Sequence, residues 1–187
     1  MSCRLAVLGI LVVALPLGAQ EQAGGPKAGA AKANAAKIAS AMSAAPKQIS
    51  AGATIAEIGA DGKMVTLRAG TNGWMCMPDD PSSPKPDPVC ADKAWQQWFG
   101  AWMAKKPPMV KQVGIAYMLM GSNDASNTDP FATKPPPGAE RISTPAHTMV
   151  LVPDPKQLDA FPTDPKNGGP FVMFKGTPYA HLMVPAH

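Results

Sequence analysis

Proline places the strongest limit on how this chain can fold. The sequence of 187 residues contains 22 prolines, and nineteen of them lie at or after Pro78. A proline fixes its own φ angle and has no N–H to give to a helix or to a strand ladder. We therefore expect short helices and strands joined by many ordered loops from Pro78 onward.

Apolar runs and turn residues predict several short strands. The expected strands are residues 54–58, 64–68, 113–120, 148–152, 171–174 and 179–184. The first two form a hairpin around Asp61-Gly62, which is a strong turn signal, and the last two form another hairpin. Asp154-Pro155 is typical of the start of a short helix. This pattern predicts an α+β fold that is loop-rich and has a small antiparallel sheet.

One amphipathic helix is expected directly after residue 87. Its large side chains recur at helical spacing on a single stripe: Trp95, Trp98, Phe99, Trp102 and Met103. Asp87 is a suitable N-cap, Pro88 suits the first helical position, and Pro107-Pro108 end the helix. Three tryptophans on one face could form a ligand platform, but such stripes more often pack into a core. We expect this Trp-rich helix to anchor the domain.

Two cysteines remain once the N-terminal segment that carries Cys3 is set aside. Cys76 and Cys90 form an even pair, and in an exported chain such a pair is expected to be a disulfide. The bond would close a fifteen-residue, proline-rich loop, and it would stabilise the fold by roughly 3 kcal/mol according to chain entropy. A thiolate metal site is the weaker alternative, because the spacing contains no Cys-x-x-Cys.

The N-terminal segment predicts export. Residues 1–19 have the form of a signal peptide: Arg4 gives a basic start, an apolar run follows, and Gly18-Ala19 are small residues at a cleavage point. The apolar run is too short for a retained membrane span. We predict that residues 20–48, rich in Ala and Lys, form a flexible tether, and that residues 49–187 form a single globular domain. The expected location is periplasmic or secreted, with no transmembrane segment after cleavage.

Charge argues against nucleic acid as a partner. The formal net charge is +4, and four lysines of the N-terminal tract account for much of the excess: Lys27, Lys32, Lys37 and Lys47. A nucleic-acid surface needs Lys and Arg clustered on one face. After residue 19 the only arginines are Arg68 and Arg141. Weak attraction to an anionic surface through the lysine tract stays open.

Two short His-x-Met segments are the candidate metal ligands. His147 with Met149, and His181 with Met183, would each place an imidazole and a thioether on one side of a strand. Nitrogen and soft sulfur together suit copper(I) if the two strands are neighbours. Further candidate ligands in the sequence are Tyr179, Met75, Met77 and His187. The alternative interpretation is a packed core, because methionine often fills irregular interiors and strand histidines often serve as hydrogen-bonded structural residues.

The polar loop at residues 122–129 is a second candidate site. Its Asn and Asp side chains could gather around Ca²⁺, but the spacing departs from the helix-loop-helix pattern, and self-capped turns explain it as well. For an enzyme, the sequence offers Asp124 with His147 or His181 as an acid/base pair of a hydrolase. It contains no Gly-x-Ser-x-Gly elbow, His-Glu-x-x-His or phosphate-binding glycine loop.

Four segments carry a resemblance to a group of uncharacterised bacterial secreted proteins. They are Asn72-Gly73-Trp74 with Cys76, Tyr117-Met118-Leu119, Ser126-Asn127-Thr128-Asp129-Pro130-Phe131, and Tyr179-Ala180-His181-Leu182-Met183-Val184-Pro185. The resemblance runs from about Asn72 to the end and leaves out the Ala/Lys tract before Ile49. It implies export and one shared domain, and it transfers no catalytic residue.

These observations lead to three functional hypotheses. The first is an exported, non-enzymatic binding or structural protein whose ligand is unknown. The second is a periplasmic copper-binding protein that uses the two His-x-Met pairs. The third is a hydrolase with a His/Asp site. The placement of the two histidines discriminates among them: facing His-x-Met strands favour copper, a cleft shared with Asp124 or Asp129 favours an enzyme, and burial of each histidine among aromatic rings favours a packed core.

Overall fold

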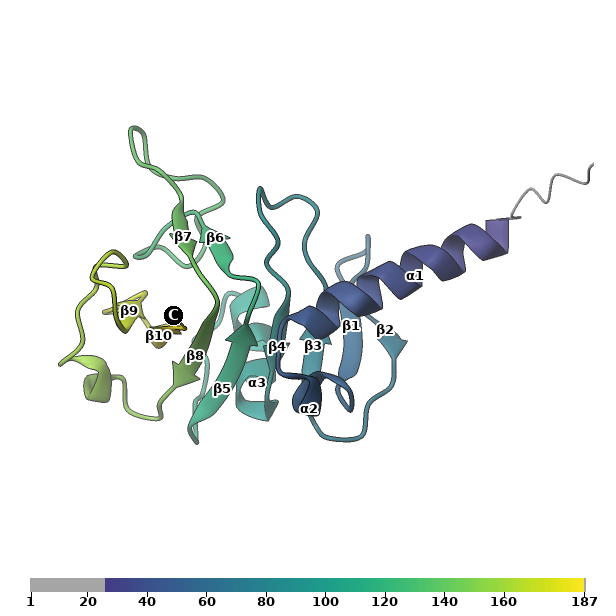
Figure 1. Ribbon diagram of the computed structural model, residues 1–187. Helices are drawn as coiled ribbons and strands as arrows, with labels where there is room; N and C mark the ends of the chain where they lie inside the picture. Colours follow the sequence, from purple (N-terminus) through teal and green to yellow (C-terminus); the bar gives the residue numbers. More distant parts are fainter. Residues whose placement is uncertain (1–25, 187) are drawn as a thin grey trace, which may run out of the picture.

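A computed structural model describes residues 26–186, which form one large sheet with helices on both of its faces (Figure 1). In chain order the elements are α1 Pro26–Ser43, α2 Lys47–Ser50, β1 Thr54–Ile58, β2 Met64–Arg68, β3 Met75–Met77, β4 Val89–Ala91, α3 Lys93–Met103, β5 Gly114–Met118, β6 Ser122–Asp124, β7 Ile142–Thr144, β8 His147–Leu151, the 3-10 helix η1 Pro155–Leu158, β9 Phe171–Met173 and β10 His181–Pro185. Most strands have only three to five residues, as the proline content predicts.

The sheet is larger than the sequence indicated. Eight strands follow the order β2-β1-β3-β4-β5-β8-β10-β9, and β6 and β7 form a separate two-stranded sheet. The expectation of a small antiparallel sheet was therefore wrong in size. It was also incomplete in direction, because β1 pairs with β3 in parallel while the other pairs are antiparallel. The strands missed in the sequence are β3, β4, β6 and β7, which have three residues each and are too short to show alternation.

The two hairpins predicted from turn residues are present. β1 and β2 pair antiparallel with Ile58 opposite Met64, and Gly62 in the turn has a φ of 76°. That positive φ explains why glycine is needed there. β9 and β10 also pair antiparallel, with His181 opposite Met173.

The Trp-rich helix α3 is confirmed, but it begins later than predicted. Asp92, not Asp87, is the N-cap: its Oδ1 accepts the N–H of Trp95 at 2.9 Å, and its Oδ2 accepts the N–H of Ile115 on β5 at 2.7 Å. Asp87-Pro88 instead precede β4. The predicted disulfide is present: Cys90 lies opposite Cys76 in the β3–β4 ladder, and residues 89–91 form a strand paired with β3 and β5, so the helix begins after them.

Helix α1 occupies most of the segment that the sequence indicated as a flexible tether. Its N-terminal half extends beyond the sheet in Figure 1 and residues 29–37 are exposed, whereas Ala41, Ala44 and Ala45 are buried beside Ile55 and the disulfide. Arg68 on β2 holds the segment that follows α1 against the sheet, because its Nη2 donates to the carbonyls of Ser50 and Ala53. Packing against the sheet therefore begins before Ile49. The signal peptide assigned to residues 1–19 lies outside the described residues.

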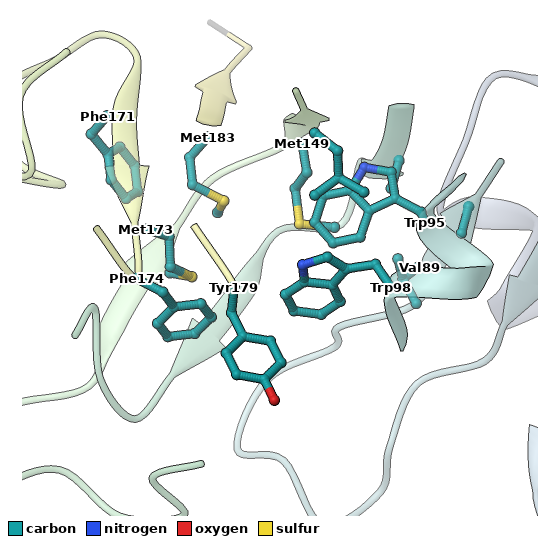
Figure 2. Close-up of a cluster of buried hydrophobic side chains, with 12 residues drawn as sticks. Val89, Trp95, Trp98, Met149, Phe171, Met173, Phe174, Tyr179 and Met183 are labelled. Carbon is teal, nitrogen blue, oxygen red and sulfur yellow. The ribbon is translucent and has the colours of Figure 1, made fainter. Parts of the chain in front are cut away.

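The sheet has a core on each face. α1 and α2 cover one face, over the side chains of Ile55, Cys76 and Cys90. α3 covers the other, where Trp95 and Trp98 pack against methionines and aromatic rings from β8, β9 and β10 (Figure 2). Because cross-strand partners share a face, residues Ala116, Met149, Met183 and Phe171 all lie on the α3 side. Within residues 26–186, no helix is long and apolar enough to cross a membrane.

Candidate functional site

The two His-x-Met segments lie on neighbouring strands and face the same side of the sheet. β8 and β10 pair antiparallel with Met149 directly opposite Met183. His147 and His181 each precede their own methionine by two residues, so all four side chains share the α3 face. The local two-fold axis of an antiparallel pair relates the first segment to the second. The arrangement is a central methionine pair flanked by one histidine at each diagonal end.

Each imidazole is buried and anchored in the same way. His147 is 0% exposed and His181 is 2% exposed. Nδ1 of His147 lies 2.7 Å from the carbonyl oxygen of Pro145, and Nδ1 of His181 lies 3.0 Å from that of Tyr179. A carbonyl can only accept, so Nδ1 carries the hydrogen in both rings, and Nε2 presents a bare lone pair when the ring is neutral.

Neither Nε2 atom has a hydrogen-bond partner within the described part of the chain. A buried nitrogen without a partner costs about 1–3 kcal/mol. Because Nδ1 and Nε2 lie on opposite sides of the ring, each Nε2 is directed away from the carbonyl that anchors its ring. The result is two unprotonated ring nitrogens that lie on the same face of the sheet as the two thioethers.

Burial also keeps both rings neutral. Desolvation lowers the pKa of His181 to about 4; the hydrogen bond to Tyr179 opposes this shift, and the neighbouring His147 adds to it. Desolvation likewise lowers the pKa of His147, against the opposing effect of the Pro145 hydrogen bond. A neutral imidazole is the form that binds metals.

Aromatic rings surround His181 on the side of α3. Its ring meets Trp95, Trp98 and Phe174 edge-on, with centroid distances of 5.0, 5.6 and 5.6 Å. Figure 2 shows Met149, Met173 and Met183 extending from the sheet toward these tryptophans. This is the aromatic burial expected of a packed core, combined with the facing strands expected of a copper site.

A pocket of about 280 Å³ opens between α3 and the loop that follows β6, and it reaches the same residues. His181, Met149 and Met173 line its inner part, Trp98 and Trp102 line a wall, and Asp87, Asp124 and Asp129 also contribute to the lining. His181 thus shares a cleft with Asp124 and Asp129, as a hydrolase would require. However, its Nδ1 is bonded to the carbonyl of Tyr179, and a pKa of about 4 makes it a weak general base near neutral pH.

Sequence reasoning missed two methionines that complete the surroundings. Met118 on β5 lies opposite His147, and Met173 on β9 lies opposite His181. The position of these methionines next to the histidines depends on strand register, so no local sequence pattern could have predicted it. Of the other candidate ligands, Tyr179 uses its hydroxyl on the carbonyl of Lys106, and Met75 and Met77 lie on β3, separated from β8 by β4 and β5. His187 lies outside the described residues.

The loop considered for Ca²⁺ uses its polar groups internally. Ser122 Oγ donates to Asp124 Oδ2, Asp129 Oδ1 accepts the N–H of Phe131, and Asn127 Nδ2 donates to the carbonyl of Thr163. Across residues 26–186, no three His, Cys, Asp or Glu side chains gather closely enough to hold a metal ion.

No protein-family model, curated protein or solved structure matches the chain. The functional argument consequently rests on the geometry of the site.

Proposed function

We propose that this is an exported binding protein that takes copper(I) at His147, Met149, His181 and Met183. One observation carries the proposal: both buried imidazoles present an unpartnered Nε2, and a directly opposed methionine pair lies between them. The four groups come from two strands that share one ladder, so the sheet itself fixes their spacing.

The donor set selects for a soft ion. Thioether sulfur and neutral imidazole nitrogen suit copper(I), while carboxylate and water ligands suit Mg²⁺ and Ca²⁺. Each proposed histidine ligand also has the usual outer partner of a metal-bound imidazole, a backbone carbonyl that accepts from the other ring nitrogen. The indole rings of Trp95 and Trp98 add aromatic faces toward which a cation is attracted.

The compartment implied by the disulfide is compatible with this chemistry. Cys76 and Cys90 are bonded, which supports export to an oxidising environment. Thioethers, unlike thiols, cannot be consumed by disulfide formation there. A copper(I) site built from methionine and histidine would keep its ligands in that compartment.

A purely structural role leaves the two nitrogens unexplained. A histidine retained only for packing would be expected to satisfy both ring nitrogens, because the unpaired one destabilises the fold. Here Nε2 lacks a partner at both positions that the local two-fold axis relates, and within the described residues Nε1 of Trp95 and of Trp98 in the same core also lacks one. Coordination of a metal would give both lone pairs a partner at once.

The test is an anaerobic titration of the metal-free protein with copper(I) against a chromophoric chelator of known affinity. We expect one equivalent to bind and the melting temperature to rise, since a ligand of the folded state stabilises it by mass action. Leucine is close to methionine in volume, so the double variant Met149→Leu/Met183→Leu should keep the fold. We expect it to bind copper(I) at least tenfold more weakly.

Met109→Leu is the matched control, because Met109 is 74% exposed and lies far along the chain from both strands. It should bind copper(I) as the original protein does. Absence of binding by the original protein, or unchanged affinity in the double variant, would contradict the proposal.

A further inference from the structure

The pocket described above has a second property, an excess of negative charge. Its lining contains the carboxylates of Asp87, Asp124 and Asp129 and contains no lysine or arginine. The whole chain carries 17 Lys and Arg residues and a net charge of +4. The pocket therefore has the opposite charge to the protein around it, which favours entry of a cation.

These carboxylates are not neutralised by ion pairs. Within residues 26–186 the salt bridges are Lys37–Glu57 and Lys63–Asp61, and neither involves the pocket. Arg141 attracts Asp124 electrostatically, but its guanidinium donates to the carbonyls of Asn123 and Thr133. Burial raises the pKa of Asp124 and that of Asp87, although hydrogen bonds from Ser122 and from the N–H of Asp80 oppose this shift.

The walls of the pocket are aromatic. Trp98 and Trp102 stack with ring planes 9° apart, and Phe99 and Phe174 also line the cavity. Indole and phenyl faces attract cations and bury apolar groups. A volume of about 280 Å³ is near the lower end for small-molecule sites, so the occupant must be compact.

The inner end supplies a separate polar acceptor. His181 lines the pocket, is 2% exposed, and has no partner for Nε2 within the described residues. The lone pair of this Nε2 can accept a hydrogen bond from a donor group of a ligand. A quaternary ammonium has no N–H to give, whereas a primary ammonium has three.

We propose that the pocket binds a small organic primary amine, whose ammonium is held by Asp124 and the Nε2 of His181 and whose apolar body packs on Trp98 and Trp102. This proposal goes beyond copper binding, because it concerns another class of ligand. The two ligands share His181, and the proposed copper ligand Met149 also lines the pocket. Copper(I) should therefore weaken amine binding, and the amine should weaken copper(I) binding equally.

The experiment uses metal-free protein and measures tryptophan fluorescence and heat on addition of three probes of similar shape. They are 2-phenylethylamine, its N,N,N-trimethyl derivative and the neutral 2-phenylethanol. We expect saturable binding of the primary amine and at least tenfold weaker binding of the other two. Equal binding of the alcohol would overturn the proposal, because charge would then be irrelevant. Equal binding of the quaternary ion would also overturn it, because N–H donors would then be irrelevant.

Variants separate the pocket from general charge effects. Asp124→Asn keeps a side-chain oxygen for the Ser122 hydroxyl, and it should weaken binding of the primary amine at least tenfold. Asp159→Asn is the matched control, because Asp159 is exposed and lies outside this pocket, and its affinity should equal that of the original protein. If Asp124→Asn lowers the melting temperature sharply, the comparison of the primary amine with 2-phenylethanol on the original protein still tests whether the charge is required.

The outcomes distinguish the two proposals. Saturable copper(I) binding without binding of the primary amine would overturn the amine site and leave the copper site in place. Binding of the amine without copper(I) would do the reverse.

Discussion

Met149 on β8 lies directly opposite Met183 on β10, and each methionine follows a buried histidine by two residues. Because the local two-fold axis relates the two His-x-Met segments, their contributions to a shared ion should be equivalent. We expect Met149→Leu and Met183→Leu, tested singly, to weaken copper(I) binding by factors that agree within about threefold. Chelator competition measures both. A loss confined to one variant would show that the ion does not lie between the strands.

The stability of the metal-free protein should fall as the solution is acidified below pH 6.5. His181 has an ordinary pKa of 6.5 in the unfolded chain and a pKa of about 4 when folded. Between these pH values the imidazole is protonated in the unfolded state but not in the folded state, so the free energy of unfolding decreases as pH falls. The contribution of His181 to the free energy of unfolding is fully present above pH 6.5 and is lost by about pH 4. The loss amounts to roughly 3 kcal/mol.

Urea unfolding at intervals between pH 7.5 and pH 4 measures this dependence. His147 should act in the same direction, because burial lowers its pKa too. In a His181→Phe variant the decline over this range should be shallower. An equally steep decline in that variant would assign the effect to other groups.

Asp92 should be among the most sensitive polar positions of the fold. Its two carboxylate oxygens accept the N–H groups of Trp95 in α3 and Ile115 in β5, so one side chain joins the helix to the sheet. Asp92→Ala removes a helix cap and leaves a strand N–H without its acceptor, which should cost about 2 kcal/mol. Denaturant unfolding tests this. Asp87→Ala, at the position that the sequence first indicated as the cap, should cost less.

Gly114 allows α3 to lie close to β5. A Cβ at this position would lie 2.8 Å from the Cβ of Ala94 and 3.2 Å from Cδ1 of Leu151. Gly114→Ala should therefore destabilise the protein by about 1–3 kcal/mol through overpacking. Gly100→Ala is a suitable control, since it lies in α3 with open space around it and should be neutral or slightly stabilising. Thermal melts of the two variants provide the comparison.

The disulfide should stabilise the fold without contributing to the site. Cys76 and Cys90 lie on the face covered by α1, whereas the two histidines lie on the opposite face. The double variant Cys76→Ala/Cys90→Ala should lose about 3 kcal/mol of stability, the amount expected for a loop of this length. Below its melting temperature it should bind copper(I) with unchanged affinity. A large loss of affinity would mean that the sheet transmits the change from one face to the other.

The local parts of this fold were predictable, and the reasons are visible in particular residues. Asp61-Gly62 between two alternating segments gave the β1–β2 hairpin, and the aromatic stripe of α3 gave the core-facing helix. The sequence indicated that this helix starts at Asp87-Pro88, whereas the structure caps it with Asp92. The difference follows from strand pairing at Cys90, which no local rule contains.

The size of the sheet and most of the pocket followed from long-range pairing. β3 and β4 have three residues each and are held by the disulfide and by their neighbours, so their own sequences carry little strand signal. The repeated His-x-Met pattern in the sequence indicated the four proposed ligands on β8 and β10. Met118, Met173 and the wall formed by Trp102 enter the site only because distant segments pack together.

The spacing of β8 and β10 along the chain has a consequence for how the site comes into being. Residues 152–180 separate the two strands, and either strand alone offers a single imidazole and a single thioether. Full affinity for the ion would consequently appear in one step, when the β8–β10 ladder closes. Copper(I) binding measured during refolding would therefore show when β10 pairs with β8.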